Sequence, residues 1–169
     1  MDGLAGIDAE QFDLVLMDCP PNFNITTKTA IVASDGILIP AKPDYLSTLG
    51  IDYLIRNLKE LIHDYNEYAN LDKGTPEQPI NPKVIGVLFT MIQIYGSQPI
   101  SAQRPYITQT KRLGVPVFKS FIRENKTIFA DAPQYGIPVV LNAYNTGTYN
   151  DVVTEIEAFA AEFKTVVKL

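Results

Sequence analysis

An aspartate that directly follows a short apolar run is the residue of this chain best placed to do chemistry. Residues 14–17 are all apolar, and Asp18 comes next, followed by Cys19, Pro20 and Pro21. Such a run is typical of a strand buried on both faces of a parallel sheet. Open α/β folds place their ligands at the carboxyl ends of such strands. We therefore expect Asp18 at a ligand-binding edge, where its carboxylate either holds a metal ion or its water shell, or caps the next turn.

The residues after Asp18 predict a stiff turn rather than a second catalytic group. Pro20 and Pro21 cannot continue a strand and restrict the backbone just beyond the acid. Cys19 could be read as a nucleophile, but the only histidine, His63, lies far along the chain on a predicted helix. Because nothing marks a base beside the thiol, we expect Cys19 to be a small buried side chain. His63 is expected to be a surface or half-buried helix residue.

Length and composition predict one globular domain over residues 1–169. The chain is 46% hydrophobic and 20% charged, which is ordinary for a protein with a substantial core. No apolar run approaches the roughly 18 residues needed to cross a bilayer. The single cysteine is compatible with a reducing compartment. We expect a cytoplasmic protein with no membrane partner.

The charges are distributed unevenly along the chain. The net charge of −5 argues against a protein whose whole surface coats nucleic acid. Residues 104–126 nevertheless contain one acid, Glu124, and six basic residues: Arg104, Lys111, Arg112, Lys119, Arg123 and Lys126. This window is either a solvated basic face or a surface that contacts phosphates.

Strand and helix patterns alternate along the chain. Apolar runs predict strands at residues 14–17, 36–40, 84–89, 115–118 and 136–141. Helical spacing predicts helices at residues 25–34, 46–68, 100–113 and 151–167, the first capped by Asn24. Residues 70–83 are polar and proline-rich and predict a surface loop. Parallel strands joined by helices imply a layered α/β sheet.

Five phrases of the sequence together resemble one family. They are, in order along the chain, residues 12–21, 33–40, 45–51, 85–91 and 132–138. In the order and spacing of these phrases the chain is similar to the C-terminal two-thirds of ParA/Soj-type partition ATPases, which are relatives of MinD and of the nitrogenase iron protein. The resemblance implies a three-layer, mostly parallel P-loop NTPase-like sheet that lacks the N-terminal phosphate-loop strand.

The resemblance also implies a nucleotide site. In the family, the position of Asp18 hydrogen-bonds a water molecule on Mg²⁺, and the turn at Pro20 and Pro21 senses the γ-phosphate of ATP. The positions of Thr90, Met91 and Pro138 lie at strand ends that face the base, although plain packing is an equal reading of these three. The implied cofactors are ATP and Mg²⁺.

The phosphate loop that family members carry is absent from this sequence. No glycine cluster precedes a Lys-Ser or Lys-Thr pair, so nothing cradles the phosphates. Phosphoryl transfer depends on positioning and charge neutralisation, and we expect no ATP hydrolysis by this polypeptide alone. In the family, the phosphate-loop strand lies between the strands equivalent to residues 14–17 and 36–40. The chain is then either a piece of a longer protein or a truncated paralogue that closes its sheet with a partner chain.

The resemblance further implies a homodimer, a ParB-like partner protein and DNA. Lys111, Arg112, Lys119, Arg123 and Lys126 are the candidate DNA contacts, but the residues just after Pro138 include no arginine. We therefore expect weak, salt-sensitive and non-specific DNA binding. Three functional classes stay open: a partitioning ATPase that segregates DNA or positions another cargo, a non-catalytic interaction module of the same fold, and a different α/β enzyme such as a cysteine hydrolase.

Overall fold

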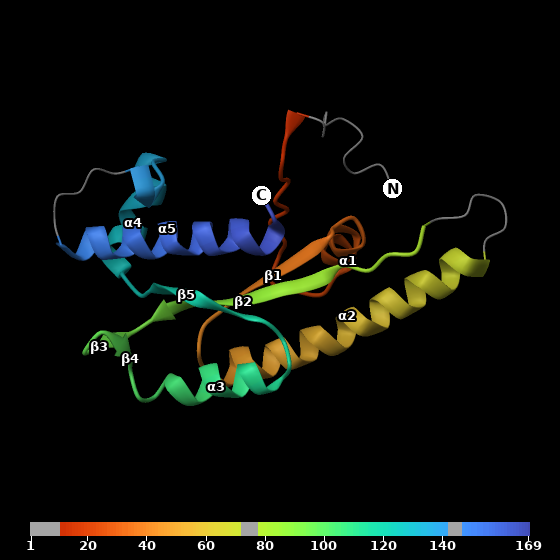
Figure 1. Ribbon diagram of the computed structural model, residues 1–169, viewed down its shortest axis with the longest axis horizontal. Helices are drawn as coiled ribbons and strands as arrows, with labels where there is room; N and C mark the ends of the chain where they lie inside the picture. Colours follow the sequence, from red (N-terminus) through yellow and green to blue (C-terminus); the bar gives the residue numbers. More distant parts are fainter. Residues whose placement is uncertain (1–10, 72–77, 142–146) are drawn as a thin grey trace. The chain divides into compact units, whose positions relative to one another are not determined.

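The computed structural model describes residues 11–71, 78–141 and 147–169, and the chain divides into two compact units (Figure 1). The first unit comprises residues 1–37, 53–83 and 169. The second unit comprises residues 38–52 and 84–168. The second unit contains most of the sheet and most of the candidate site.

The first unit is built from helix α1 and the long part of helix α2. Helix α1 spans Ile25–Val32, and the side chain of Asn24 accepts a hydrogen bond from the Thr27 N–H at 3.1 Å, so the predicted cap is confirmed. Helix α2 spans Tyr45–Leu71, as its apolar spacing predicted. The side chain of Asn66 donates to the Ile80 carbonyl and accepts from the Ile80 N–H, which ties the described end of the predicted loop 70–83 to α2.

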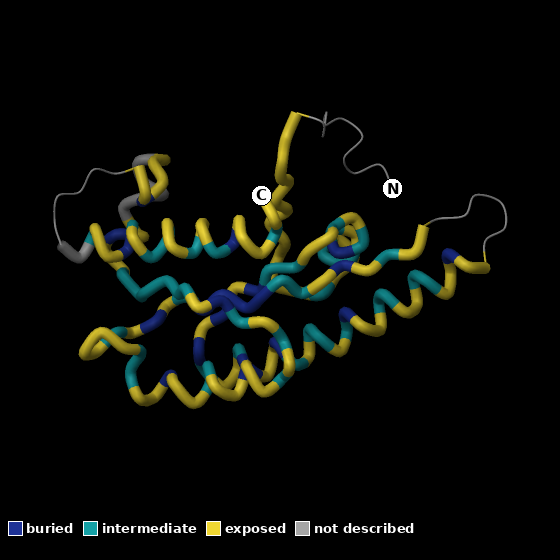
Figure 2. Tube along the Cα trace, viewed as in Figure 1, coloured by how far each residue is buried: buried dark blue, intermediate teal, exposed yellow. Residues whose placement is uncertain are grey.

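A three-stranded sheet organises the second unit. Its strands are β1 (Gly36–Ala41), β2 (Lys83–Ile92) and β5 (Val117–Arg123), in the order β1-β2-β5, and β2 pairs with β5 in parallel. A small antiparallel hairpin, β3 (Ile94–Tyr95) and β4 (Gln98–Pro99), follows β2. Strand β2 is the central strand, and its residues 86–89 are all buried, as their unbroken apolar pattern predicted (Figure 2).

Helices cover both faces of this sheet. Helix α5 (Gly147–Val167) lies along one face and helix α3 (Arg104–Arg112) lies on the opposite face, with α4 (Lys126–Tyr135) and the 3-10 helix η2 (Val139–Leu141) between β5 and α5 in the chain (Figure 1). The core joins Leu88, Phe118 and Phe163, and Phe159 meets Phe118 edge-on with ring centroids 5.3 Å apart. The predicted α/β fold with a mostly parallel sheet is confirmed.

Strands β2 and β5 each contain a bulge. Val87 pairs with Val117 and Phe89 with Phe121, so β5 has two extra residues between these pairs. Ile92 pairs with Arg123, so β2 has one extra residue in the next interval. Bulged residues leave the regular ladder, and their backbone groups need other partners. Both bulges lie next to residues of the candidate site.

Three element predictions from the sequence need correction. The run 136–141 is not a strand: Gly136 ends α4 with φ 64°, and the Leu141 N–H donates to the Pro138 carbonyl in the 3-10 helix η2. Helix α3 starts at residue 104 rather than 100, with a proline in its first turn. Strand β5 begins at residue 117 and extends to 123, because Gly114, with φ 75°, and Pro116 precede it.

The largest correction concerns residues 14–17, which form no strand. All residues from 11 to 22 are exposed, with Leu14 and Val15 each 40% accessible and Leu16 74% (Figure 2). A strand is held by hydrogen bonds to its neighbours, and no strand among the described residues pairs with this segment. The apolar run therefore has neither a ladder nor a core around it.

Candidate functional site

Asp18 lies in an exposed turn that leads into α1. The Asn22 N–H donates to the Pro20 carbonyl at 2.8 Å, and the Thr27 hydroxyl donates to the Asn22 carbonyl at 2.8 Å. Pro20 and Pro21 thus shape a tight turn, as predicted, but it is fixed to the start of α1. The prediction that Asp18 ends a buried strand is wrong, because residues 14–17 have no strand partner. Its proposed contact with a magnesium-bound water stays a prediction.

Cys19 is exposed rather than buried, so the expectation of a small core side chain is wrong. Its Sγ lies 3.7 Å from the Met17 carbonyl oxygen. His63 lies on the exposed side of α2, with its Nε2 3.7 Å from an oxygen of Glu67. This confirms the surface reading of His63, and within the described ranges no hydrogen bond joins Cys19 to a base.

The exposure of Cys19 gives a direct test of the geometry around Asp18. We expect the native protein to react with a thiol reagent within minutes, at a rate within about threefold of that of the denatured chain, because the exposed side chain is open to the reagent in both states. The chain has one cysteine, so the signal is unambiguous. A native thiol protected a hundredfold or more would contradict the exposed turn.

Thr90 and Met91 lie at the β2 bulge, near the carboxyl end of the central strand. Met91 has φ 54°, a left-handed conformation that is uncommon outside glycine, and its side chain is 56% exposed. Thr90 is half-buried beside it. Strained backbone of this kind persists only where neighbours hold it. The structure therefore brings these two predicted residues together at a strand end, whereas Pro138 is exposed just before η2.

Gln103 holds the bulge in place, and the sequence pattern did not single it out. Its amide nitrogen donates to the Met91 carbonyl at 3.3 Å, and its amide oxygen accepts from the Gln93 N–H at 2.9 Å. Gln103 is 6% exposed, so both bonds form in a protected environment. The Glu124 N–H also donates to the Ile92 carbonyl at 2.8 Å. These contacts define the shape of the β2 end.

The predicted DNA contacts fall into two groups. Lys111 and Arg112, in the last turn of α3, are exposed, as are Lys119 on β5 and Lys126 at the start of α4. Arg123 differs: its Nη1 is 2.7 Å from Asp151 and its Nε is 2.7 Å from Glu155, and its side chain is only 23% exposed. Burial acts to lower the pKa of Arg123, but the two carboxylates outweigh it and raise the pKa. In this arrangement Arg123 ties β5 to α5, and its role as a phosphate contact stays a prediction.

Two glutamates of α5 accept hydrogen bonds from backbone N–H groups of strand β5. Glu162 accepts hydrogen bonds from the Lys119 N–H at 2.9 Å, the Ser120 N–H at 2.8 Å and the Ser120 hydroxyl at 2.6 Å. Glu155 accepts from the Arg123 N–H at 2.9 Å. Lys119 and Ser120 lie in the β5 bulge, so Glu162 supplies the acceptors that the ladder does not. Burial would raise the pKa of Glu162, but these hydrogen bonds lower it overall.

The residues present do not by themselves fit magnesium-ATP. Asp18 is an isolated, exposed carboxylate, and among the described residues no three His, Cys, Asp or Glu side chains gather to hold a metal ion. The sequence also contains no phosphate loop to meet the charge of a triphosphate. We therefore derive no catalytic step for this polypeptide alone.

The fold and the order of its motifs define the chain as a P-loop NTPase-like α/β protein. A family model described as an AAA domain matches residues 3–71. The chain is 28% identical to the chromosome-partitioning ATPase Soj of Thermus thermophilus and 25% identical to the sporulation initiation inhibitor protein Soj of Bacillus subtilis, over 79% and 88% of this chain. An uncharacterized protein of Pseudomonas putida is 29% identical over 78% of this chain. In sequence the chain is thus similar to the Soj and ParA partitioning proteins.

The matches cover only part of each relative. They span 47% of the Thermus protein, 53% of the Bacillus protein and 43% of the Pseudomonas protein, so the chain spans about half the length of its curated relatives. No solved structure matches the chain. None of the helices in the described ranges is long and apolar enough to cross a bilayer.

Proposed function

We propose that this chain is the part of a ParA-like partitioning ATPase that contains the Asp18 turn and the strand β2. It cannot hydrolyse ATP unless further polypeptide supplies a phosphate loop. On this proposal Asp18 contacts magnesium-bound water, Pro20 and Pro21 shape the turn at the γ-phosphate, and Thr90, Met91 and Pro138 face the base. The partners are a second copy, a ParB-like protein and DNA, in the cytoplasm. The cargo is a chromosome, a plasmid or a protein cluster.

The observation that carries this proposal is the exposed apolar segment at residues 14–17, which leads into Asp18. Burying an apolar side chain contributes about 25 cal/mol for each Å² removed from water, so an accessible run of four such residues favours a covering layer. A parallel strand on this segment would turn it into the buried strand that its sequence predicts. That strand would place Asp18 at a sheet edge, which is the position its proposed role requires.

The proposal predicts that purified residues 1–169 have no magnesium-dependent ATP turnover. The wild-type chain and the Asp18→Asn variant should release phosphate at the same rate at every protein concentration. Neither has a phosphate loop to neutralise the charge of the phosphates. The measurement is phosphate release under excess ATP and Mg²⁺. Turnover by the wild-type chain that Asp18→Asn abolishes would refute this part of the proposal.

A non-catalytic interaction module is the second candidate, and the same exposed segment favours it. In that case a partner polypeptide covers residues 14–17 without supplying nucleotide chemistry. Ligands that bind only the folded state raise its stability. Thermal unfolding of the protein together with its covering polypeptide therefore separates the two candidates: a midpoint raised by ATP and Mg²⁺ supports the ATPase, and an unchanged midpoint supports the module.

A further inference from the structure

The two bulges of the sheet nearly compensate for each other. Val87 pairs with Val117, and a regular ladder counted from this pair would place Met91 opposite Phe121. In the structure β5 first gains two residues and β2 then gains one, so the offset that remains at the carboxyl ends is a single residue. The bulged and the regular ladder therefore differ mainly between these pairs, and the two bulges can form or disappear together.

Met91 lies in the bulge of β2, between the paired residues Phe89 and Ile92. Its φ of 54° is far from the value of about −120° that a parallel strand requires. A residue other than glycine keeps such a conformation only where its surroundings hold it. One cause lies on β5: Phe121 already pairs with Phe89, so residue 91 has lost the partner that a regular ladder would give it.

The carboxylate of Glu162 stabilises the bulged form of β5. It accepts hydrogen bonds from two consecutive backbone N–H groups, those of Lys119 at 2.9 Å and Ser120 at 2.8 Å. Successive N–H groups of a regular strand point to opposite sides, so one carboxylate accepts from both only where the strand is irregular. Consecutive N–H groups turned to one side form a concave site that suits an anion. The contact thus favours the bulged ladder over the regular one.

A second glutamate of α5 acts on the other side of the Phe121 pair. Glu155, seven residues before Glu162 and on the same face of the helix, accepts from the Arg123 N–H at 2.9 Å. Helix α5 lies along one face of the sheet (Figure 1) and binds backbone N–H groups of β5 both before and after Phe121. These contacts keep Phe121 opposite Phe89.

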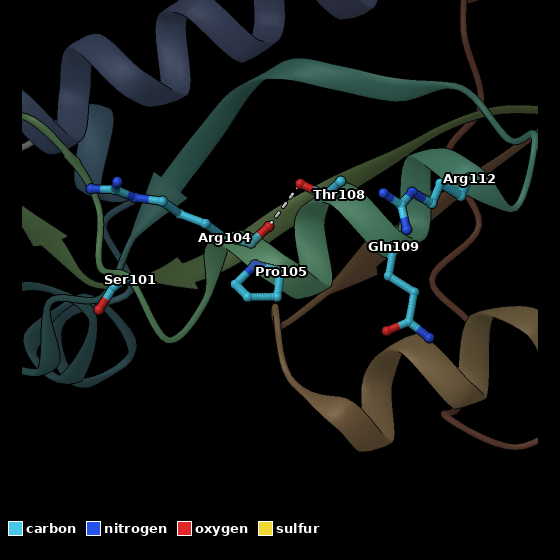
Figure 3. Close-up of a pocket in the computed structure, with 6 residues that line it drawn as sticks. All are labelled: Ser101, Arg104, Pro105, Thr108, Gln109 and Arg112. Carbon is cyan, nitrogen blue, oxygen red and sulfur yellow. Dashed lines mark hydrogen bonds between the residues drawn. The ribbon is translucent and has the colours of Figure 1, made fainter.

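On the α3 side, the end of β2 is held independently of α5. Gln103 is 6% exposed and donates from its amide to the Met91 carbonyl at 3.3 Å. Its neighbour Arg104 donates from Nε to the Pro99 carbonyl at 2.7 Å, which ties the start of α3 to the β3–β4 hairpin. Arg104 also lines an open depression of about 660 Å³ along α3, and Gln103 does not (Figure 3). Gln103 is turned towards β2 instead.

We propose that Glu162 controls the conformation of Met91 through the paired bulges. With the carboxylate on β5, both bulges form and residue 91 is left-handed; without it, both strands return to the regular ladder and residue 91 becomes extended. The consequence for nucleotide rests on the proposed function, in which Met91 faces the base. Helix α5 then regulates that end of the site from the opposite face of β5.

This coupling acts in both directions. If the state of α5 changes the preference of residue 91 for one conformation, a change at residue 91 alters the hold of Glu162 on β5 by the same factor. A ligand that selects one form of the strand end would therefore tighten or loosen α5. The coupling is a property of the folded chain and is measurable without any nucleotide.

The test compares Met91→Gly with Met91→Ala, because this pair of variants reports the backbone conformation. Glycine adopts positive φ without the steric cost that alanine has. With Glu162 present, we expect the folding equilibrium constant of Met91→Gly to exceed that of Met91→Ala by about threefold or more. In a Glu162→Ala background the order should reverse, because glycine is the less stable residue in an extended strand. Denaturant unfolding measures each constant, and the general cost of losing Glu162 cancels within a background.

Three further backgrounds make the result specific. Glu157→Ala removes an exposed glutamate of the same helix and should leave the preference for glycine unchanged. Gln103→Ala removes the direct contact with the Met91 carbonyl and should reduce that preference. Glu162→Gln keeps one acceptor oxygen and should give an intermediate value, which decides the question if Glu162→Ala does not fold. In folded variants, the NOE between the amide and α protons of residue 91, strong at positive φ, should weaken with the loss of Glu162.

Three outcomes would overturn the proposed control: no preference for glycine at residue 91 in the otherwise wild-type chain, the same preference in the Glu162 variants as in that chain, or an equal loss of preference in Glu157→Ala. A loss seen in Gln103→Ala but in neither Glu162 variant would assign the hold on Met91 to α3 alone. None of these measurements involves ATP. Their failure leaves the partitioning proposal untouched, and ATP turnover by the chain alone would leave the coupling untouched.

Discussion

Gly86→Ala is expected to lower the free energy of unfolding by about 2 kcal/mol, within the range that overpacking of a core costs. A Cβ at residue 86 would lie 2.5 Å from Cε2 and 2.7 Å from Cδ2 of Phe118. Phe118 is 7% exposed and contacts Phe159 edge-on, so its ring cannot move aside without losing that contact. Gly86 lies in the buried part of the central strand. Phe118 of β5 approaches its backbone so closely that only glycine fits at this position without a clash.

Gly50→Ala is the matched control for this substitution. Gly50 lies inside α2, and a Cβ built there meets nothing within 4 Å. Glycine inside a helix is less stable than alanine by about 0.5–1 kcal/mol, so Gly50→Ala should stabilise the protein. The same chemical change thus has opposite expected signs at two positions, and denaturant unfolding measures both.

A double variant tests whether the clash with Phe118 is the cause. Phe118→Leu removes the ring atoms nearest residue 86, and Gly86→Ala should then cost less than it does in the wild-type background, by about 1 kcal/mol or more. Additive effects of the two substitutions would show that the cost of Gly86→Ala arises elsewhere. A Gly86→Ala variant as stable as the wild type would contradict the packing described for β2 and β5.

The elements that the sequence predicted correctly are those whose partners lie within the described chain. The runs at 36–40 and 84–89 form β1 and β2 because each strand has a neighbour in the sheet. The run at 14–17 has the same apolar pattern but no neighbour, and it forms no strand. An apolar run indicates that burial is favourable. Whether the run forms a strand depends on whether residues far away in the sequence provide a strand to pair with it.

The candidate site was only partly predictable for a similar reason. Asp18, Thr90 and Met91 were found from local patterns, whereas Gln103 and Glu162 act across long separations. Gln103 reaches back 12 residues to the Met91 carbonyl, and Glu162 reaches 43 residues to Lys119. Their roles depend on bulges, and no residue type in β2 or β5 marks a bulge in the way that glycine or proline marks a turn. Nothing in the sequence around Gln103 or Glu162 marks either residue as a hydrogen-bond partner of a bulged strand.

The basic window illustrates how tertiary structure divides residues of one type. Six cations occur within residues 104–126, and the sequence alone treats them as equivalent. The carboxylates of Asp151 and Glu155 on α5 engage Arg123, while the described residues provide no carboxylate partner for the cations of α3. Local sequence gave no sign that Arg123 would be paired, because its two partners lie 28 and 32 residues away.

Glu162→Gln is expected to lower the free energy of unfolding at neutral pH by about 2 kcal/mol, because hydrogen bonds to a charged group contribute about 1.5–3 kcal/mol each and an amide offers one acceptor oxygen. In the wild type, the carboxylate accepts three bonds from Lys119 and Ser120. The amide NH₂ would also face backbone donors. At about 2–4 °C per kcal/mol for a chain of this size, the thermal midpoint should fall by about 4–8 °C. Glu157→Gln, an exposed position on the same helix, should be near neutral.

The same glutamate gives the stability a defined pH dependence. The pKa of Glu162 is lowered from its ordinary value of 4.5, because the bonds from Lys119 and Ser120 outweigh the effect of burial. A lowered folded-state pKa contributes stability that is fully present above the unfolded-state pKa and is lost as the pH falls through the folded-state value. The difference between wild type and Glu162→Gln should therefore be constant at neutral pH and shrink below about pH 4.5. Unfolding curves at several pH values measure this difference. A difference that is unchanged well below that pH would mean that the carboxylate charge does not hold α5 against β5.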